Sequence, residues 1–287
     1  MYKRQGKSTL LNRLIEQKIS ITSRKSQTTR NNILGIKTKD NHQMVFIDTP
    51  GVHINASKVM NKVLNQSALG AIEDADLIIF MLQRNKINTL DELILERLKG
   101  VETRKICVIN KLDQVASINS LLPIIEKLRS ENDFAEIIPV SAKTGKNINE
   151  LENMICQNLP ENNHLYDSET KFLAKESFMI SEIIREKIIR FLGEELPHET
   201  YVQLQKLENK ENIINIDAEI IVARESQKGI VVGKNGAKLK KIGEKARIDL
   251  EKFFNKKVFL KTWVKTKKNW NNDSDFISSL GIGSLYD

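Results

Sequence analysis

Two short segments near the start of the chain carry residue types that handle phosphate groups. Gly6-Lys7-Ser8-Thr9 matches the end of the pattern GxxxxGK[ST], in which loop amides and a helix N-terminus hold phosphates, the lysine reaches the β- and γ-phosphates, and the serine hydroxyl binds Mg²⁺. Asp48-Thr49-Pro50-Gly51 ends a predicted strand, so its carboxylate can hold a Mg²⁺-bound water and its glycine amide can approach a γ-phosphate. Either segment alone is also typical of an ordinary turn. Together they predict a site for a nucleoside triphosphate and Mg²⁺.

Two later segments carry groups that recognise a purine base. Asn110-Lys111-Leu112-Asp113 follows a predicted strand, and its aspartate offers two acceptor oxygens to the ring N–H and exocyclic amine of guanine. Adenine lacks this pair of donors and would leave the acceptors unpaired. Ser141-Ala142-Lys143 follows the next strand, where a backbone amide can reach guanine O6. The predicted nucleotide is therefore GTP or GDP, with Asp113 as the residue that excludes ATP.

The elements that position these segments alternate between short apolar runs and helix-length amphipathic stretches. Candidate strands cover 33–39, 43–48, 76–82, 105–110 and 136–140, and candidate helices cover 8–14, 58–72, 91–99, 118–130 and 148–158. This alternation predicts an α/β fold with a mixed, mostly parallel sheet, and such sheets bind ligands beyond the carboxyl ends of their strands. We therefore expect a P-loop GTPase domain over residues 1–163.

The phosphate-binding pattern is incomplete on its N-terminal side. Its first glycine is expected five residues before Gly6, where the chain has Met1, and no residues remain for the strand that precedes such a loop. We therefore expect an N-terminally truncated chain that lacks the first strand and half of the phosphate loop, with Met1 to Gln5 in place of native residues.

A basic glycine loop marks the second half of the chain, after a predicted linker at 164–170. Gly233-Lys234-Asn235-Gly236 follows Ile230 and Val231 and precedes a helix that carries Lys238, Lys240 and Lys241. Two glycines let a loop backbone approach a sugar-phosphate chain, and the lysines supply positive charge. A lone GxxG is common in tight turns, but the predicted order here is helix (172–191), strand (200–207), strand (213–222), helix, helix and strand (257–264). This order resembles that of an α+β type II KH domain, which we place at 171–287, and the resemblance implies that the residues named here contact RNA.

The distribution of charge agrees with a polyanionic partner. The 287 residues include 45 Lys and Arg against 37 Asp and Glu, a net charge of +8. From Lys228 to Lys268, 14 basic residues stand against three acidic ones, a local charge of +11. The longest strongly apolar run, 77–82, is far shorter than the roughly 20 residues of a transmembrane helix. Cys107 and Cys156 lack metal-ligand spacing, as do the four histidines, so we predict structural roles for them.

Residues 18–30, KISITSRKSQTTR, and residues 48–53, DTPGVH, are similar to the Era family of bacterial ribosome-assembly GTPases. The resemblance covers nearly the whole chain. It implies a GTP-hydrolysing switch that binds the 3′ end of 16S rRNA and acts in assembly of the 30S subunit. It further implies that 27–30 form switch I, that Thr29 binds Mg²⁺ with Ser8 and Asp48, and that Lys7, Thr29 and Gly51 act in catalysis. We expect a cytoplasmic monomer, with peripheral contact to the inner membrane permitted by its basic half.

One position departs from Ras-like GTPases. There a glutamine after the DxxG glycine orients the attacking water, whereas this chain has Val52, which forms no hydrogen bond to water. We therefore expect slow intrinsic hydrolysis. The resemblance implies that K⁺ supplies the missing positive charge, although the asparagine that assists K⁺ in relatives corresponds here to Arg4.

Two other functions are compatible with the same residues. One is a non-catalytic RNA-binding protein with a dead nucleotide site, which the incomplete phosphate loop favours. The other is a GTPase of the same class without RNA specificity. Hydrolysis measured with and without rRNA, and replacement of the loop glycines, distinguish these alternatives.

Overall fold

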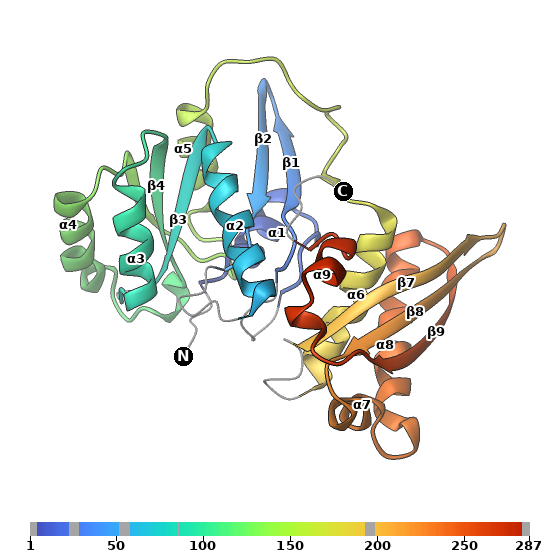
Figure 1. The fold of residues 1–287 in the computed structure, drawn as a ribbon. Coiled ribbons are helices and arrows are strands. Elements are labelled where there is room, and N and C mark those ends of the chain that lie inside the picture. The colour runs from blue at the N-terminus through green and yellow to red at the C-terminus, as the bar shows by residue number, and fades with distance from the viewer. Residues whose placement is uncertain (1–4, 23–28, 52–57, 85, 193–198, 283–287) are drawn as a thin grey trace. The chain divides into compact units, whose positions relative to one another are not determined.

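A computed structural model of the chain describes residues 5–22, 29–51, 58–84, 86–192 and 199–282 (Figure 1). The chain forms two compact units, of which the first takes in most residues up to Leu173 and the second begins in the main at Ala174. The predictions made for Arg4, Gln27, Thr28 and Val52 fall outside the described residues.

The first unit contains two three-stranded sheets. Strands β1 (Ile33–Lys39), β2 (His42–Asp48) and β6 (Phe172–Leu173) form an antiparallel sheet in the order β2-β1-β6. Strands β3 (Leu77–Gln83), β4 (Arg104–Asn110) and β5 (Glu136–Pro139) form a parallel sheet in the order β3-β4-β5. The helices are α1 (Lys7–Ile15), α2 (Val59–Glu73), α3 (Thr89–Leu98), α4 (Leu122–Glu131) and α5 (Ile148–Asn158), with 3₁₀ turns at Leu112–Gln114 and Ile118–Leu121.

The parallel sheet is buried on both faces, as βαβ connections require. Alternate residues of β4 point to opposite sides, so Ile106 and Val108 join a core with α1 and α5, while Cys107 and Ile109 join a core with α3 and α4. The first of these cores also contains Met44 of β2. The two sheets are therefore covered by one pair of helices on one face, with a second pair packed on the far face of β3-β4-β5.

The α/β fold with mixed strand pairing is confirmed, but the strands are divided between an antiparallel sheet and a parallel sheet. Among the described residues no strand joins β2 to β3. The first unit also extends beyond the predicted boundary at 163. Phe172 pairs with Gly35 in the β1–β6 ladder, and Gln43 accepts hydrogen bonds from the backbone of Leu165 and Tyr166. The predicted linker is thus attached to the first unit.

The second unit has the predicted order of elements. Helix α6 (Glu176–Phe191) is followed by β7 (Thr200–Asn209), β8 (Ile213–Val222), α7 (Glu225–Val232), a 3₁₀ turn (Lys234–Gly236), α8 (Ala237–Phe254) and β9 (Lys257–Thr266). Strand β8 pairs antiparallel with β7 and parallel with β9. A 3₁₀ turn (Trp270–Asn272) and α9 (Ser274–Ser279) follow. The predicted helix over 172–191 begins later, because Phe172 and Leu173 pair as β6.

Helices α6 and α8 pack on the sheet of the second unit through apolar stripes. Ile180, Ile184 and Ile188 recur every four residues on α6 and are fully buried.

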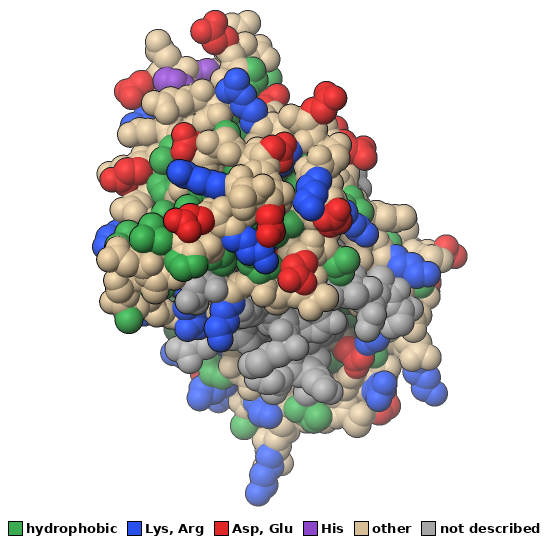
Figure 2. All heavy atoms as spheres, turned by 90° about the vertical axis from the view of Figure 1, so that its left-hand side faces the viewer, with side chains coloured by type: hydrophobic (Ala, Val, Ile, Leu, Met, Phe, Trp, Pro, Cys, Tyr) green, Lys and Arg blue, Asp and Glu red, His purple; other side chains and the backbone are tan. Residues whose placement is uncertain are grey.

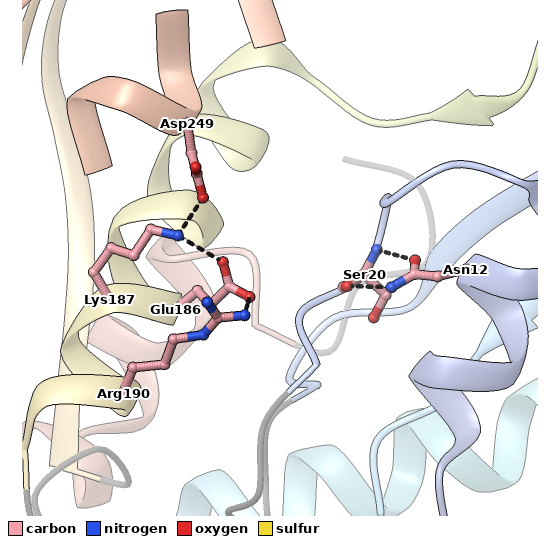
Figure 3. A network of polar contacts seen from close by, with 6 residues as sticks. All are labelled: Asn12, Ser20, Glu186, Lys187, Arg190 and Asp249. Atoms are coloured by element: carbon pink, nitrogen blue, oxygen red, sulfur yellow. Dashed lines mark hydrogen bonds and ion pairs between the residues drawn. The ribbon is translucent and has the colours of Figure 1, made fainter. Parts of the chain in front are cut away.

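A cluster of charged side chains also joins α6 to α8. Lys187 donates to Glu186 at 3.0 Å and to Asp249 of α8, and Arg190 donates to Glu186 at 2.7 Å (Figure 3).

The surface of the first unit carries both signs of charge. On the face that Figure 2 shows, Lys and Arg side chains are interspersed with Asp and Glu side chains over this unit. The net positive charge of the chain is concentrated instead between Lys228 and Lys268, in the second unit.

Candidate functional sites

The start of α1 brings together three of the predicted nucleotide segments. Gly6 has a φ of +93°, and a Cβ at this position would lie 2.5 Å from Nδ2 of Asn110. Asn110 donates from Nδ2 to the Gln5 carbonyl at 2.7 Å, and its Oδ1 accepts from the Ala142 amide at 3.0 Å. Asn110 therefore joins the phosphate-loop segment to the loop that contains Ser141, Ala142 and Lys143, which we call the base loop. Only glycine at position 6 allows this close approach.

A second cluster forms around the carboxylate of Asp48. Oδ2 of Asp48 accepts from the hydroxyls of Ser8 at 2.7 Å and Thr29 at 3.2 Å, and these two hydroxyls lie 3.1 Å apart. The structure thus brings together the three residues predicted to bind Mg²⁺, although 40 residues separate Ser8 from Asp48 in sequence. Ser20, which no sequence pattern selected, donates to the same oxygen at 2.8 Å.

The donors of this cluster suit Mg²⁺. A hard divalent cation takes oxygen ligands, and Mg²⁺ is bound in such sites by one or two carboxylates together with phosphate and water. Ser8, Thr29 and Asp48 offer two hydroxyls and one carboxylate within hydrogen-bond distance of one another. Asp48 and Thr29 are buried, so few waters compete for their oxygens.

Lys7 lies at the first position of α1, where the helix N-terminus favours an anion. Burial lowers the pKa of its ammonium group, and the negative charge of Asp48 partly offsets this effect. A cation held in this environment gains most from a phosphate group, which supplies the missing negative charge. Its position is consistent with the predicted phosphate contact.

Side-chain hydrogen bonds hold the loop at 141–144 and join it to Asp113. Ser141 donates from its hydroxyl to Oδ1 of Asp113 at 2.6 Å, and the same hydroxyl oxygen accepts from the Thr144 amide at 3.2 Å. Asp113 itself is exposed, while Ser141 is fully buried. The buried Ser141 hydroxyl therefore holds one oxygen of Asp113, while the Asp113 carboxylate stays accessible to a base.

Several other predicted nucleotide residues lie beside these groups without a contact that defines their role. Thr9, Thr49 and Gly51 are half-buried, Pro50 is buried and Lys143 is exposed. Lys111 has a left-handed backbone (φ +69°), and its amide donates to Oδ1 of Asn110. Their contacts with nucleotide, and the catalytic role of Gly51, stay predictions.

The glycine loop of the second unit depends on left-handed backbone at three positions. Gly233, Asn235 and Gly236 have φ values of +72°, +50° and +77°. A Cβ on Gly233 would lie 2.7 Å from Cβ of Lys238, whereas nothing lies within 4 Å of the corresponding point on Gly236. Gly233 is therefore required by packing, and Gly236 leaves open space above the loop.

A groove of about 410 Å³ lies beside this loop, between α8 and β9. Its lining combines basic, acidic and apolar side chains with two glycines: Gly236, Leu239, Lys240, Gly243, Glu244, Arg247, Leu260 and Thr262. Gly236 and Lys240 belonged to the sequence prediction, and the other six did not. Their spacing of three and four residues on α8, and of two on β9, is the signal that identifies one helix face and one strand face.

The predicted RNA-binding residues differ in their accessibility. Lys234, Asn235, Lys238, Lys240 and Lys241 are exposed, and Ile230 is 44% exposed. Val231 is fully buried in the hydrophobic core, so its side chain packs in the core and is not available to RNA.

Comparison with known protein families assigns both units. The profile of the "50S ribosome-binding GTPase" family matches residues 2–111, and the KH domain profile matches residues 195–271. GTPase Era of Coxiella burnetii (strain Dugway 5J108-111) is 46% identical over 277 residues, which cover 96% of this chain and 94% of the relative. GTPase Era of Pasteurella multocida (strain Pm70) is 44% identical, with 96% and 90% of the two chains covered.

Two solved structures have the same fold over both units. A single-residue variant of Aquifex aeolicus Era bound to GDP and AlF₄⁻ matches with a TM-score of 0.93 at 35% identity, over 96% of this chain and 95% of that one. Era in complex with MgGDPNP and nucleotides 1506–1542 of 16S ribosomal RNA matches with the same score and identity, over 96% and 94%.

Proposed function

This chain belongs to the GTPase Era family and is a GTP hydrolase, and from this premise we propose that it is a switch that binds the 3′ end of 16S rRNA during assembly of the 30S subunit. The observation that carries the proposal is the convergence of Ser8, Thr29 and Asp48 at one point of the first unit. A protein without nucleotide binding would not require three oxygen-bearing side chains from separate segments to converge in this way.

In this proposal, different residues of the first unit bind Mg²⁺, contact the phosphates and recognise the base. Ser8, Thr29 and Asp48 would hold Mg²⁺, which when bound neutralises developing charge on the phosphates. Lys7 contacts the β- and γ-phosphates, and its positive charge stabilises the transition state. The Gly51 amide lies near the γ-phosphate, and Asp113 selects guanine. We extend the proposal to K⁺, because Val52 provides no hydrogen bond to the attacking water.

The second unit supplies the RNA site. The exposed lysines around Gly233–Gly236 contact sugar-phosphate, and single-stranded bases lie along the groove between α8 and β9. Leu239 and Leu260 offer an apolar floor to the bases, and Arg247 adds positive charge at the far end of the groove.

The choice of the small subunit rests on the relatives that share both units. The matching family profile is described by binding to the 50S subunit and covers only residues 2–111. The Era complex with 16S rRNA covers 96% of this chain, including the KH unit. We therefore place the 16S rRNA 3′ end, and not 50S RNA, in the groove.

The setting in the cell completes the proposal. Among the described residues, no helix is long and apolar enough to cross a bilayer. We propose a cytoplasmic monomer that hydrolyses GTP to GDP, with peripheral contact between its basic half and the inner membrane through anionic lipids.

GTP hydrolysis with and without Mg²⁺, measured in the presence and absence of an RNA that ends in the 16S 3′ sequence, tests the proposal. We expect slow Mg²⁺-dependent hydrolysis and RNA binding that weakens steeply with salt. RNA binding without any hydrolysis would identify a pure binding module. Hydrolysis without RNA binding would identify a GTPase that lacks RNA specificity.

A further inference from the structure

The loop after α1 returns to the metal cluster through Ser20. This side chain is 3% exposed, and its hydroxyl donates to Oδ2 of Asp48 at 2.8 Å. The same oxygen accepts from Ser8 and Thr29. Three hydroxyls therefore surround one carboxylate oxygen, and only two of them belong to the proposed metal ligands.

A hydroxyl has a single proton, so its direction matters when the metal site is occupied. In the proposed Mg²⁺ site Ser8 and Thr29 would offer lone pairs to the cation while each keeps its proton as a donor. The hydroxyl of Ser20 is not assigned to the cation, so it keeps its proton for Asp48. Ser20 is thus the one of these three donors whose oxygen is not itself a proposed metal ligand, so metal binding leaves its hydrogen bond to the carboxylate in place.

Asn12 fixes Ser20 in turn. Its side-chain oxygen accepts from the Ser20 amide at 2.8 Å, and its Nδ2 donates to the Ser20 carbonyl at 2.8 Å (Figure 3). The same oxygen also accepts from the Ile19 amide at 2.9 Å. Asn12 and Ser8 are four residues apart on α1 and share one helix face. One rigid helix therefore sets two of the three hydroxyls around Asp48.

We propose that Asn12 and Ser20 form a positioning pair that orients Asp48 toward Mg²⁺. The inference rests on the proposed function, because it assumes a Mg²⁺ site at Ser8, Thr29 and Asp48. Neither Asn12 nor Ser20 contacts the cation, and each acts through the next residue. Residues that orient a metal ligand commonly change metal affinity by about 10- to 100-fold when removed.

The test is a titration of Mg²⁺ against the dissociation rate of a fluorescent GDP. We expect Ser20→Ala to raise the Mg²⁺ concentration at the midpoint about tenfold while dissociation in EDTA stays as in the wild type. Asn12→Ala should shift the midpoint at least as far, and the double variant no further than Asn12→Ala alone. Ser130→Ala, an exposed serine on α4, is the matched control.

Two results would contradict the proposal that Asn12 and Ser20 orient Asp48. One is an unchanged midpoint in Ser20→Ala, and the other is an equal loss of GDP affinity with and without Mg²⁺, which is the signature of a general structural role. If GDP release from the wild type shows no dependence on Mg²⁺, the proposed metal site itself fails, which is a separate outcome.

The neighbouring residue on α1 carries a second inference, from different contacts. Arg13 donates from Nε to the Ala142 carbonyl at 3.3 Å and from an Nη atom to the Lys143 carbonyl at 2.7 Å. These consecutive carbonyls belong to the loop predicted to face the guanine base. We infer that Arg13 is a positioning residue for base recognition, linking the helix of the phosphate site to the base loop.

Competition experiments separate this role from phosphate binding. Arg13→Ala should weaken GDP binding about three- to tenfold, because the exposed guanidinium is partly screened by solvent. Competition by inorganic tripolyphosphate should stay unchanged, since it has no base. Arg13→Lys should restore part of the loss, and Arg97→Ala on α3 is the control. Equal weakening of GDP and tripolyphosphate, or no weakening of GDP, would contradict the inference.

Discussion

The hydroxyl of Ser141 donates to Oδ1 of Asp113 at 2.6 Å, which fixes one oxygen of an otherwise exposed carboxylate. A buried residue of one loop thereby orients Asp113, the proposed base-selecting residue, in another loop. This arrangement leaves the carboxylate as an acceptor for the two donors of guanine.

Replacing the acceptor with a donor should change which base is preferred. In Asp113→Asn the amide N–H₂ faces the 2-amino group of guanine, whereas xanthine has a carbonyl oxygen at that position. We expect GTP affinity to fall at least 100-fold and XTP affinity to rise, as measured by competition with a fluorescent nucleotide. Ser141→Ala should cost about tenfold in GTP affinity without changing base preference. Unchanged GTP affinity in Asp113→Asn would contradict the assignment of Asp113.

Two features require glycine at position 6: its φ is +93°, and a Cβ there would lie 2.5 Å from Nδ2 of Asn110. Gly6→Ala should therefore displace Asn110 from the phosphate-loop segment and the base loop, and abolish measurable nucleotide binding. Gly70→Ala is the matched control, because Gly70 lies in α2 with nothing within 4 Å of its Cβ. That substitution should raise stability by about 0.5–1 kcal/mol and leave binding unchanged. Isothermal titration with GDP measures both variants.

Lys7 should show opposite effects on binding and on stability. Burial lowers its native pKa from 10.5, so the charged form destabilises the nucleotide-free fold below that pKa. Lys7→Met should lose GTP binding and raise the stability of the nucleotide-free protein by about 1 kcal/mol near pH 7. The cost of the charge disappears as pH rises toward the unfolded value of 10.5, so the advantage of Lys7→Met should shrink in that window. Calorimetric melting temperatures at pH 7 and pH 10 test this, and an advantage that grows with pH would contradict it.

Lys187 holds two acidic side chains in the second unit, Glu186 and Asp249. Lys187→Met leaves them without this cation and should destabilise the unit by about 3–5 kcal/mol. Arg190→Met is the control, because its side chain is 50% exposed and should cost less than about 1 kcal/mol. Trp263 and Trp270, the two tryptophans of the chain, lie in this unit, so their fluorescence during urea unfolding reports its stability. Equal effects of the two substitutions would contradict a buried role for Lys187.

Patterns carried by neighbouring residues predicted the fold well. The strand at 213–222 and the helix at 148–158 have the predicted bounds, because alternation and helical spacing are local properties. The pairing of Phe172 with Gly35 was not predictable, since a two-residue strand has no period of its own. Because Phe172 and Leu173 form this strand, α6 begins at Glu176 and not at the predicted residue 172.

The candidate site was predictable where a motif fixes residue type and spacing, as at Lys7 and Asp48. Ser20 carries no such signal, because its role depends on a fold that returns it to Asp48. Val231 shows the reverse case, because from sequence an apolar residue beside a functional loop suits a core position and a ligand contact equally well. Burial, which depends on the whole fold, separates the two.

The two loop glycines are not equivalent tests of RNA binding. A Cβ on Gly233 would meet Lys238 at 2.7 Å, so a substitution there alters the loop itself. Gly236 has open space around its Cβ position and lines the groove, so Gly236→Asp places a negative charge in the groove at about 1 kcal/mol of backbone strain. We expect RNA affinity to fall at least tenfold and GTP affinity to stay unchanged. Gly100→Asp, which also has open space around its Cβ position, is the control for the added charge. Equal RNA affinity of Gly236→Asp and wild type in a filter-binding series at increasing salt would exclude the groove as the RNA site.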